Sequence, residues 1–340
     1  MSKNAYVIAE IGINHCGKIK IAKQLIDIAK KSGANAVKFQ TYNTEKLINK
    51  DEDLMPYQKL NIKKKINQFE MLKQNELSES NHIKLINYCK KKKIEFISTP
   101  YDMESAKLLI KLGLKIIKIA STDITNVELI RYLLSKKIKL ILSTGATNLN
   151  ELDILFKIIG SKNNLKKISL LHCISFYPAP IESLNLKVIN NLKNRFKVKV
   201  GFSDHSLSNF AGSFAITLGA EIIEKHITLS HKLMGPDHKA SLEPKDFYEY
   251  VNLIRDAQKS LGDGIKKVEK VEKLTKKSMQ KSIIVTKDLI KGAKINYKNT
   301  SSMRPATGIS PLYIDKLIGK KLNYPKKKNE IIFWKDLYKH

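Results

Sequence analysis

The chain has 340 residues, of which 42% are apolar and 7% aromatic, so it can bury a substantial core and is not a disordered protein. Its length suits one large domain with a small one, or two domains of medium size. No secretory leader is recognisable at the start, "MSKNAYVIAE", and no apolar run approaches the length of a membrane span. The cysteines are odd in number and widely spaced, which argues against a disulfide framework: Cys16, Cys89 and Cys173. We therefore expect a cytoplasmic protein without membrane association.

The formal net charge of +30 raises the question of nucleic-acid binding. Lysine supplies nearly all of this charge, and it is scattered among Ile and Asn through every segment, as in "KKKIEFIS" and "SKKIKLIL". This pattern is typical of a compositional bias carried on solvated faces, and no DNA or RNA recognition motif occurs. We expect no nucleic-acid partner, although the positive field would attract anionic substrates. A basic nucleic-acid-binding module stays an alternative, which tight, salt-sensitive oligonucleotide binding would reveal.

Short apolar, β-branched runs alternate with helical patterns over residues 1–264. Each run is nearly continuous in hydrophobicity, which favours parallel strands buried on both faces. We predict strands at 5–12, 36–42, 94–100, 116–122, 139–145, 167–175, 198–206 and 221–229. Helical patterns cover 21–33, 104–113, 208–219 and 243–262. This alternation predicts a (β/α)8 TIM barrel. A doubly wound sheet is the alternative, but no G-x-G-x-x-G follows the first strand.

Two regions depart from the regular alternation. An excursion of about 40 residues follows the second strand, and long insertions in barrels tend to lie at the active-site rim. Residues 265–280 are highly charged and predict an exposed linker. Residues 281–340 then form a separate small domain with short β-type runs. Such a domain buries only a marginal core, so we expect it to lean on the barrel or on another subunit.

Polar residues gather at the predicted carboxyl ends of the strands, where barrels place their active sites. Lys38 and Lys118 lie inside the apolar runs "AVKFQ" and "IIKIA". A buried lysine needs a partner, or its pKa shifts and it loses its charge. Two lysines that point into a barrel mouth suit a phosphate and a carboxylate. Structural lysines paired with carboxylates are the alternative.

The stretch "GFSDHS" (201–206) contains the three residue types of a hydrolase triad. Successive side chains of a strand face opposite ways, so Ser203 and His205 share a face that Asp204 does not. Three adjacent residues therefore cannot form a Ser-His-Asp relay, and no G-x-S-x-G elbow surrounds Ser203. We exclude a triad.

A metal site is the better interpretation. His205 ends the seventh predicted strand and His226 the eighth, so the two imidazoles should be neighbours at the rim. With oxygen ligands or water they suit a divalent ion such as Mn, Fe, Co or Zn. The loop "GPDHKAS" (235–241) places Asp237 and His238 near the same point, although an ordinary turn is the alternative.

Ordered motifs run along nearly the whole chain: "AEIGINHCGKIKIAKQLIDIAKKSGANAVKFQT", "STPYDMESAKLL", "KIASTDITN", "LSTGAT", "LHCISFYPAP", "GFSDHS", "EKHITL" and "GPDHKASLEP". In these motifs the chain resembles the sialic acid synthase family, which includes N-acetylneuraminate synthase and N,N'-diacetyllegionaminate synthase. The tail "KSIIVTKDLIKGAKI … MRPATGISP" resembles the antifreeze-like (SAF) domain of that family.

The resemblance implies condensation of phosphoenolpyruvate with an N-acyl amino sugar, giving a nonulosonic acid and phosphate. The si face of phosphoenolpyruvate C3 attacks the open-chain aldehyde, which a divalent metal polarises. Water then adds to the oxocarbenium carbon, and a tetrahedral intermediate expels phosphate by C–O cleavage. Mn²⁺ is the expected metal, with Mg²⁺ or Co²⁺ as alternatives. The expected acceptor is N-acetylmannosamine or a close relative, and the alternative acceptor is 2,4-diacetamido-2,4,6-trideoxymannose, the legionaminate precursor.

The resemblance also implies roles for individual residues. His205 and His226 match the metal ligands. The phosphoenolpyruvate-binding positions are Lys38, Lys118, Ser121, Ser143 and Ser203. The sugar-binding positions are Glu10, Ser175, Tyr177, Asp237 and Arg304, and the catalytic positions are Asp123, Glu10 and Lys118. Arg304 matches a tail-domain arginine that enters the partner subunit's site, which implies a domain-swapped homodimer.

Two positions depart from the family pattern. The chain has "STDITN" where the family commonly has "SGEITN", so the acid/base carboxylate falls on Asp123 and is one methylene shorter. Ser175 replaces an asparagine of the family. A shorter acid loses reach, and both changes fall where the sugar is expected. The identity of the acceptor is therefore open. Because the acid at Asp123 is shorter than that of the family, a non-catalytic carbohydrate-binding barrel is the alternative function.

Overall fold

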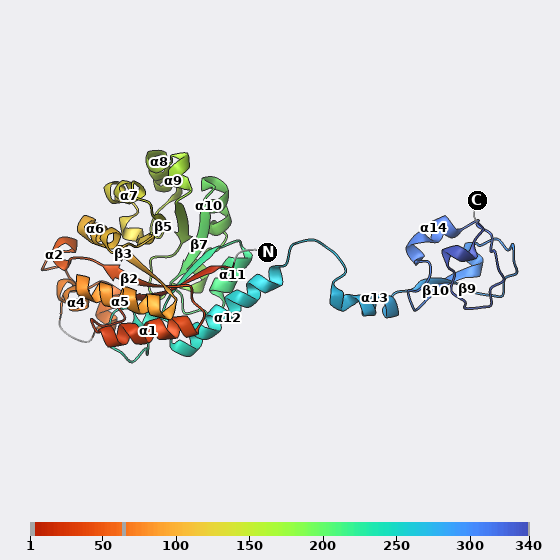
Figure 1. The fold of residues 1–340 in the computed structure, drawn as a ribbon, viewed down its shortest axis with the longest axis horizontal. Helices are drawn as coiled ribbons and strands as arrows, with labels where there is room; N and C mark the ends of the chain where they lie inside the picture. The colour runs from red at the N-terminus through yellow and green to blue at the C-terminus, as the bar shows by residue number, and fades with distance from the viewer. Residues whose placement is uncertain (1–3, 63–65, 339–340) are drawn as a thin grey trace. The chain divides into compact units, whose positions relative to one another are not determined.

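Eight parallel strands close into a barrel in chain order in the computed structural model, which describes residues 4–62 and 66–338 (Figure 1). The strands are β1 (Tyr6–Gly12), β2 (Ala36–Thr41), β3 (Glu95–Pro100), β4 (Ile116–Ile119), β5 (Lys139–Ser143), β6 (Ile168–His172), β7 (Lys199–Asp204) and β8 (Ile222–His226). β8 pairs with β1 and closes the ring, with His226 opposite Glu10. The predicted TIM barrel is confirmed.

Helices follow the strands and cover the outside of the barrel (Figure 1). They are α1 (Ile19–Lys31), α5 (Glu79–Lys92), α6 (Met103–Lys111), α7 (Val127–Leu134), α8 (Leu149–Ile159), α9 (Lys162–Leu165), α10 (Val188–Phe196), α11 (Ala211–Thr217) and α12 (Pro244–Leu261). α11 begins three residues after the predicted start at Ser208. The reason is a local turn, because the Ser208 hydroxyl accepts hydrogen bonds from the N–H groups of Phe210 and Ala211.

Several strands end earlier than predicted. β4 stops at Ile119 and is followed by a 3₁₀ turn, η1 (Ser121–Asp123). β6 stops at His172 and β8 at His226. The polar residues beyond these points belong to turns, because the barrel wall ends there and the backbone must turn into the next helix.

The inward side chains of the barrel form layers, because alternate strand residues face the interior. The lower layer is an apolar cluster of Ile8, Ala36, Ile97, Ile141, Leu171 and Ile222, with Tyr6 and Ile116 packed against it. In β7 the corresponding position is Gly201, where a Cβ atom would lie 2.7 Å from Leu171 Cδ2. Two residues further along, the inward positions of every strand except β6 become polar: Glu10, Lys38, Thr99, Lys118, Ser143, Ser203 and Glu224. The apolar layer thus supports a buried polar layer at the carboxyl ends.

The insertion after β2 lies at this rim. It contains α2 (Thr44–Leu47), α3 (Pro56–Asn61) and α4 (Gln68–Asn75). Its buried side chains Leu54, Met71 and Leu72 pack with Ile13 and Tyr42. Because these two residues directly follow β1 and β2, the insertion covers the carboxyl ends of those strands.

The chain divides between Asp263 and Gly264 into two compact units. The second unit contains α13 (Lys273–Met279), α14 (Ile314–Leu317) and the antiparallel pair β9 (Ser282–Val285) and β10 (Thr300–Met303). Its core consists of Ile283, Val285, Leu289, Ile295, Ile309, Leu317, Leu322, Ile332 and Leu337. The segment predicted as a linker, 265–280, is exposed throughout but includes α13, since its lysines, Leu274 and Met279 are good helix formers. Within residues 4–62 and 66–338, no helix combines the length and apolarity of a membrane span.

The small core of the second unit makes its stability sensitive to single side chains. We expect Leu317→Ala, at a fully buried site, to lower the free energy of unfolding of this unit by about 2–5 kcal/mol. Leu312→Ala in the same unit is the matched control, because Leu312 is 90% exposed and the change should cost under about 0.5 kcal/mol. Hydrogen exchange resolved by segment measures both, and barrel amides should keep their protection. Equal effects of the two changes would contradict this core.

Candidate functional site

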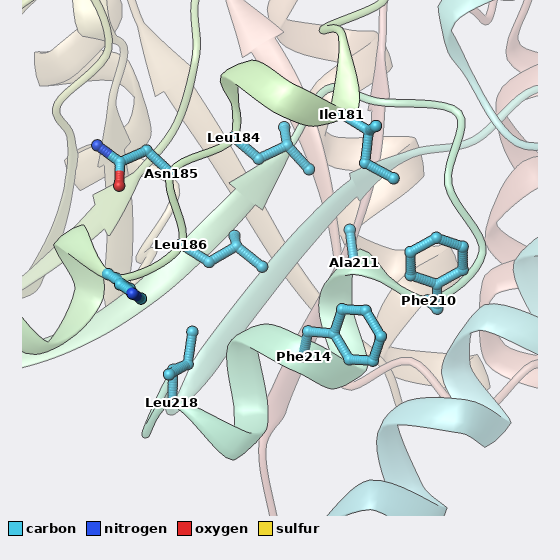
Figure 2. A pocket seen from close by; sticks show the side chains of 9 residues that line it. Ile181, Leu184, Asn185, Leu186, Phe210, Ala211, Phe214 and Leu218 are labelled. Carbon is cyan, nitrogen blue, oxygen red and sulfur yellow. The ribbon is translucent and has the colours of Figure 1, made fainter.

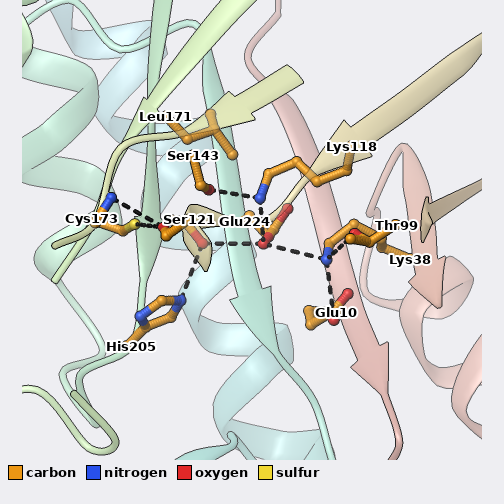
Figure 3. A network of polar contacts seen from close by, with 12 residues as sticks. Glu10, Lys38, Thr99, Lys118, Ser121, Ser143, Leu171, Cys173, His205 and Glu224 are labelled. Carbon is orange, nitrogen blue, oxygen red and sulfur yellow. Dashed lines mark hydrogen bonds and ion pairs between the residues drawn. The ribbon is translucent and has the colours of Figure 1, made fainter. Parts of the chain in front are cut away.

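Glu224 lies at the centre of a buried ion cluster inside the barrel (Figure 3). Its Oε1 atom is 3.7 Å from the Nζ atom of Lys38 and 3.7 Å from that of Lys118. The Lys38 ammonium also lies 3.1 Å from Glu10 Oε1. The four residues come from β1, β2, β4 and β8, so the cluster joins distant parts of the ring. The two predicted rim lysines are therefore brought together, around a carboxylate that the sequence analysis did not identify.

Hydroxyl groups surround the same cluster. Lys118 Nζ donates to Ser143 Oγ at 2.5 Å, and Lys38 Nζ donates to Thr99 Oγ1 at 3.2 Å. Ser203 donates to Glu224 Oε1 at 3.0 Å. Ser121 belongs to an adjacent group, where its Oγ accepts from the N–H of Gly145 at 3.0 Å and lies 3.3 Å from Cys173 Sγ (Figure 3). Of the three predicted phosphoenolpyruvate hydroxyls, that of Ser143 contacts a lysine, that of Ser203 contacts Glu224, and that of Ser121 lies in the adjacent group.

The electrostatics of this cluster follow from burial and from the pairing of its two lysines with two carboxyls. Burial raises the pKa of Glu10 to about 7, although Lys38 opposes the shift. Burial would also raise the pKa of Glu224, but Lys118 and Lys38 outweigh it and hold that pKa well below its usual range. Burial lowers the pKa of Lys118, whereas the charges of Glu10 and Glu224 outweigh burial and raise that of Lys38. Both lysines can contact a bound phosphate or carboxylate, which would stabilise their charged forms.

The two predicted metal ligands lie side by side at the top of this cluster, with ring centroids 5.8 Å apart. His205 Nδ1 is 2.7 Å from the carbonyl oxygen of Ile174. A carbonyl only accepts, so Nδ1 carries the proton and Nε2 keeps its lone pair for a ligand. Burial lowers the pKa of His205 to about 4 and that of His226 well below its usual range, which keeps both rings neutral.

One buried polar atom of this pair bears on the predicted metal site. The Nδ1 atom of His226 is buried and has no hydrogen-bond partner among the described residues. In the part of the chain that the structure describes, no group of three or more His, Cys, Asp or Glu could hold a metal ion. The protein would therefore supply two imidazoles, and substrate or water oxygens would complete the coordination.

Tyr177 joins the histidine pair from the loop after β6. Its ring stacks on that of His205 at a centroid distance of 4.2 Å, and its hydroxyl lies 3.3 Å from His205 Nε2. Asp237 is buried nearby in the loop after β8, where burial raises its pKa to about 6 and Lys38 opposes the shift. These two predicted sugar-pocket residues lie close to the predicted metal and phosphoenolpyruvate positions.

Asp123 and Ser175 lie further out. Asp123 is half-buried in η1 and accepts a hydrogen bond from Thr122 at 3.2 Å. Burial raises its pKa. Ser175 is exposed, and a Cβ atom on Gly145 would lie 2.2 Å from its hydroxyl oxygen. Neither side chain contacts the lysine cluster among the described contacts. Arg304 lies in the second unit, where its Nε atom donates to the carbonyl of Met279 at 2.9 Å.

Sequence reasoning missed three residues of this region. Glu224 and His226 are separated by two positions in "EIIEKHITL", so strand alternation could have placed both on the inner face. Thr99 similarly follows Ile97 by two positions in β3. Tyr101 is the third missed residue, and no spacing in the sequence indicated it. Burial raises the pKa of its hydroxyl, and the charges of Glu10, Asp123 and Asp237 raise that pKa further. This phenol therefore stands among the three acids of the site.

An apolar hollow lies on the outside of the barrel (Figure 2). It is lined by Ile181, Leu184, Asn185, Leu186, Lys187, Phe210, Ala211, Phe214 and Leu218. This lining contains no carboxylate or imidazole, so the chemistry belongs to the barrel mouth and not to this hollow.

Comparisons with known proteins agree with this arrangement. Models of the NeuB family and of the SAF domain match residues 25–266 and 280–337. The N,N'-diacetyllegionaminic acid synthases of Campylobacter jejuni and Legionella pneumophila are 42% and 40% identical to the chain. These alignments cover 97% and 99% of this chain, and 99% and 95% of the respective relatives. The structure of the N-acetylneuraminic acid (sialic acid) synthetase from Leptospira borgpetersenii superimposes with a TM-score of 0.71 at 33% identity, covering 80% of this chain and 90% of that one. The chain therefore belongs to the NeuB family and carries a SAF domain after its barrel.

Proposed function

We propose that this enzyme condenses phosphoenolpyruvate with an N-acylated amino sugar, giving a nonulosonic acid and phosphate. The observation that carries the proposal is the buried cluster of Lys38, Lys118 and Glu224, with the imidazoles of His205 and His226 directly above it. A trianionic substrate needs fixed cations in a dry site, and a sugar aldehyde needs an electrophile nearby. The names of the relatives support the same class of reaction.

In this proposal phosphoenolpyruvate takes the inner position. The ammonium groups of Lys38 and Lys118 hold its phosphate and carboxylate, and hydroxyls of Ser121, Ser143 and Ser203 complete the contacts. The cations are already in place, so little reorganisation accompanies binding. Residues of the lower apolar layer, such as Ile97 and Ile141, close the barrel beneath the substrate and exclude water from the enol carbon.

The sugar takes the outer position beside the histidines. His205 and His226 would hold Mn²⁺, with Mg²⁺ or Co²⁺ as alternatives, and the ion supplies Lewis acidity toward the aldehyde oxygen when bound. Tyr177 and Asp237 orient the sugar hydroxyls, in keeping with their positions beside the imidazoles.

Two carboxyls handle protons in this proposal. The attacking water must lose a proton, and the aldehyde oxygen must gain one. Glu10, whose pKa of about 7 lies near ambient pH, can hold or release a proton beside Lys38. Asp123, in the turn η1 that follows β4, serves as the second acid/base group on the sugar side.

Two acceptors are specific candidates. The legionaminic acid synthases that resemble this chain favour 2,4-diacetamido-2,4,6-trideoxymannose. The sialic acid synthetase structure favours N-acetylmannosamine, the acceptor first expected from the motifs. Asp123 and Ser175 stand where the family commonly has longer side chains, which suits the bulkier diacetamido sugar.

A side-by-side assay distinguishes the acceptors. With phosphoenolpyruvate and Mn²⁺ present, we expect phosphate release and an α-keto acid product with the diacetamido sugar. Its kcat/KM should exceed that for N-acetylmannosamine by about 10-fold or more, because polar pocket groups left unpaired reject the simpler sugar. The reverse preference would assign an N-acetylneuraminate synthase. Absence of turnover with both sugars would overturn the proposal.

We further propose a domain-swapped homodimer in which Arg304 contacts the N-acyl group in the partner subunit's site. The exposed position of Arg304 just after β10 and the small core of its domain support this arrangement. Arg304→Ala should raise the KM for the sugar more than that for phosphoenolpyruvate. Mixing this variant with Lys118→Met should restore part of the activity, because one mixed site then has both intact residues. If no activity returns although subunits exchange, as seen by mass spectrometry of labelled chains, the swap is wrong.

A further inference from the structure

Each of the two histidines directly follows a charged residue that faces away from the barrel interior. Asp204 is the last residue of β7 and directly precedes His205, and Lys225 precedes His226 on β8. Asp204 and Lys225 are opposite one another in the register of the two strands. Strand alternation therefore puts the imidazoles on the inner face and this acid–base pair on the outer face, one residue away.

The outer pair is completely buried and fully bonded. Lys225 Nζ lies 2.9 Å from Asp204 Oδ2, and both side chains are 0% exposed. Asp204 Oδ1 accepts from the N–H and the hydroxyl of Ser206 at 2.9 and 2.7 Å. Lys225 Nζ also donates to the carbonyl oxygen of Ser206. Bonds on the outer face thus hold the residues on both sides of His205.

Helix α12 adds a third member to this network. The Tyr250 hydroxyl donates to Asp204 Oδ2 at 2.8 Å. Gly212 of α11 makes room for it, because a Cβ atom there would lie 2.4 Å from the Tyr250 hydroxyl oxygen. The packing of α11 and α12 therefore lets the Tyr250 hydroxyl reach the end of β7, next to His205.

We propose that Asp204, Lys225 and Tyr250 are positioning residues that set the separation and orientation of His205 and His226 for a divalent metal. A buried ion pair contributes little net stability compared with apolar residues of similar size, so its value here is geometric. It ties two strand ends in register and leaves the imidazoles little backbone freedom. This inference rests on the proposed function, because it takes the two histidines as the metal ligands.

The test compares Co²⁺ and Mn²⁺ binding by the metal-free full-length protein and its variants. Calorimetry gives the Kd, and the visible absorption of bound Co²⁺ reports ligand geometry. We expect Asp204→Asn/Lys225→Met, which leaves no isolated buried charge, to stay folded and to weaken Mn²⁺ binding by about 10-fold or more. Tyr250→Phe, a smaller change, should weaken it by a smaller factor. Both should alter the Co²⁺ spectrum.

Leu133→Ala on α7 is the control for a general loss of stability, because Leu133 is fully buried in the helical layer away from β7 and β8. It should lower the melting temperature but leave metal affinity and the Co²⁺ spectrum unchanged. If the double variant and Tyr250→Phe bind both metals like the parent protein, the positioning role is wrong while the metal site stands. If the parent protein itself binds neither metal, or His205→Ala binds as the parent does, the metal assignment in the proposed function fails instead.

Discussion

The interaction on which the site depends is the charge balance around Glu224. Two buried lysines, Lys38 and Lys118, share the carboxylate of Glu224, and Lys38 also pairs with Glu10. The hydroxyls of Thr99 and Ser143 accept hydrogen bonds from the two lysines. Without that carboxylate the lysines would repel each other in a medium of low polarity, and at least one would lose its proton. With it, the two lysines and two carboxyls form one connected ion network inside the barrel. The fold thus places two buried lysines above the lower apolar layer, where we propose that the anionic substrate binds.

Strand alternation divides the residues at the ends of β7 and β8 between two networks, one inside the barrel and one behind its wall. In "SDH" and "EKH", the inner residues Ser203 and Glu224 belong to the ion cluster, with the histidines above them. The outer residues Asp204 and Lys225 pair with each other behind the wall. One strand pair therefore supplies part of the proposed anion site, the proposed metal ligands and the residues that we propose position them. Strand alternation, which excluded a Ser-His-Asp triad, also puts Asp204 on the outer face, where it pairs with Lys225.

Much of this architecture follows from local sequence. Continuous apolar runs predict buried parallel strands, and lysines inside such runs predict a polar barrel interior. The strand ends were less predictable, as at β4, because η1 forms through backbone turns that leave no apolar signature. The partners of buried charges were not predictable, since Tyr250 meets Asp204 only through the packing of α12 on the barrel. Glu224 was predictable in principle from its two-residue spacing to His226, but its role depends on lysines that come from β2 and β4.

The most direct measurement is a calorimetric titration of phosphoenolpyruvate into two lysine variants. Lys118→Met removes a buried cation of the cluster, and Lys115→Met removes an exposed one just before the same strand, with the same change in net charge. The account predicts that Lys118→Met weakens binding by about 10–100-fold, the worth of a hydrogen bond to a charged group, while Lys115→Met binds like the parent protein. Equal losses in the two variants would mean that only the general positive field attracts the ligand, and would contradict the account.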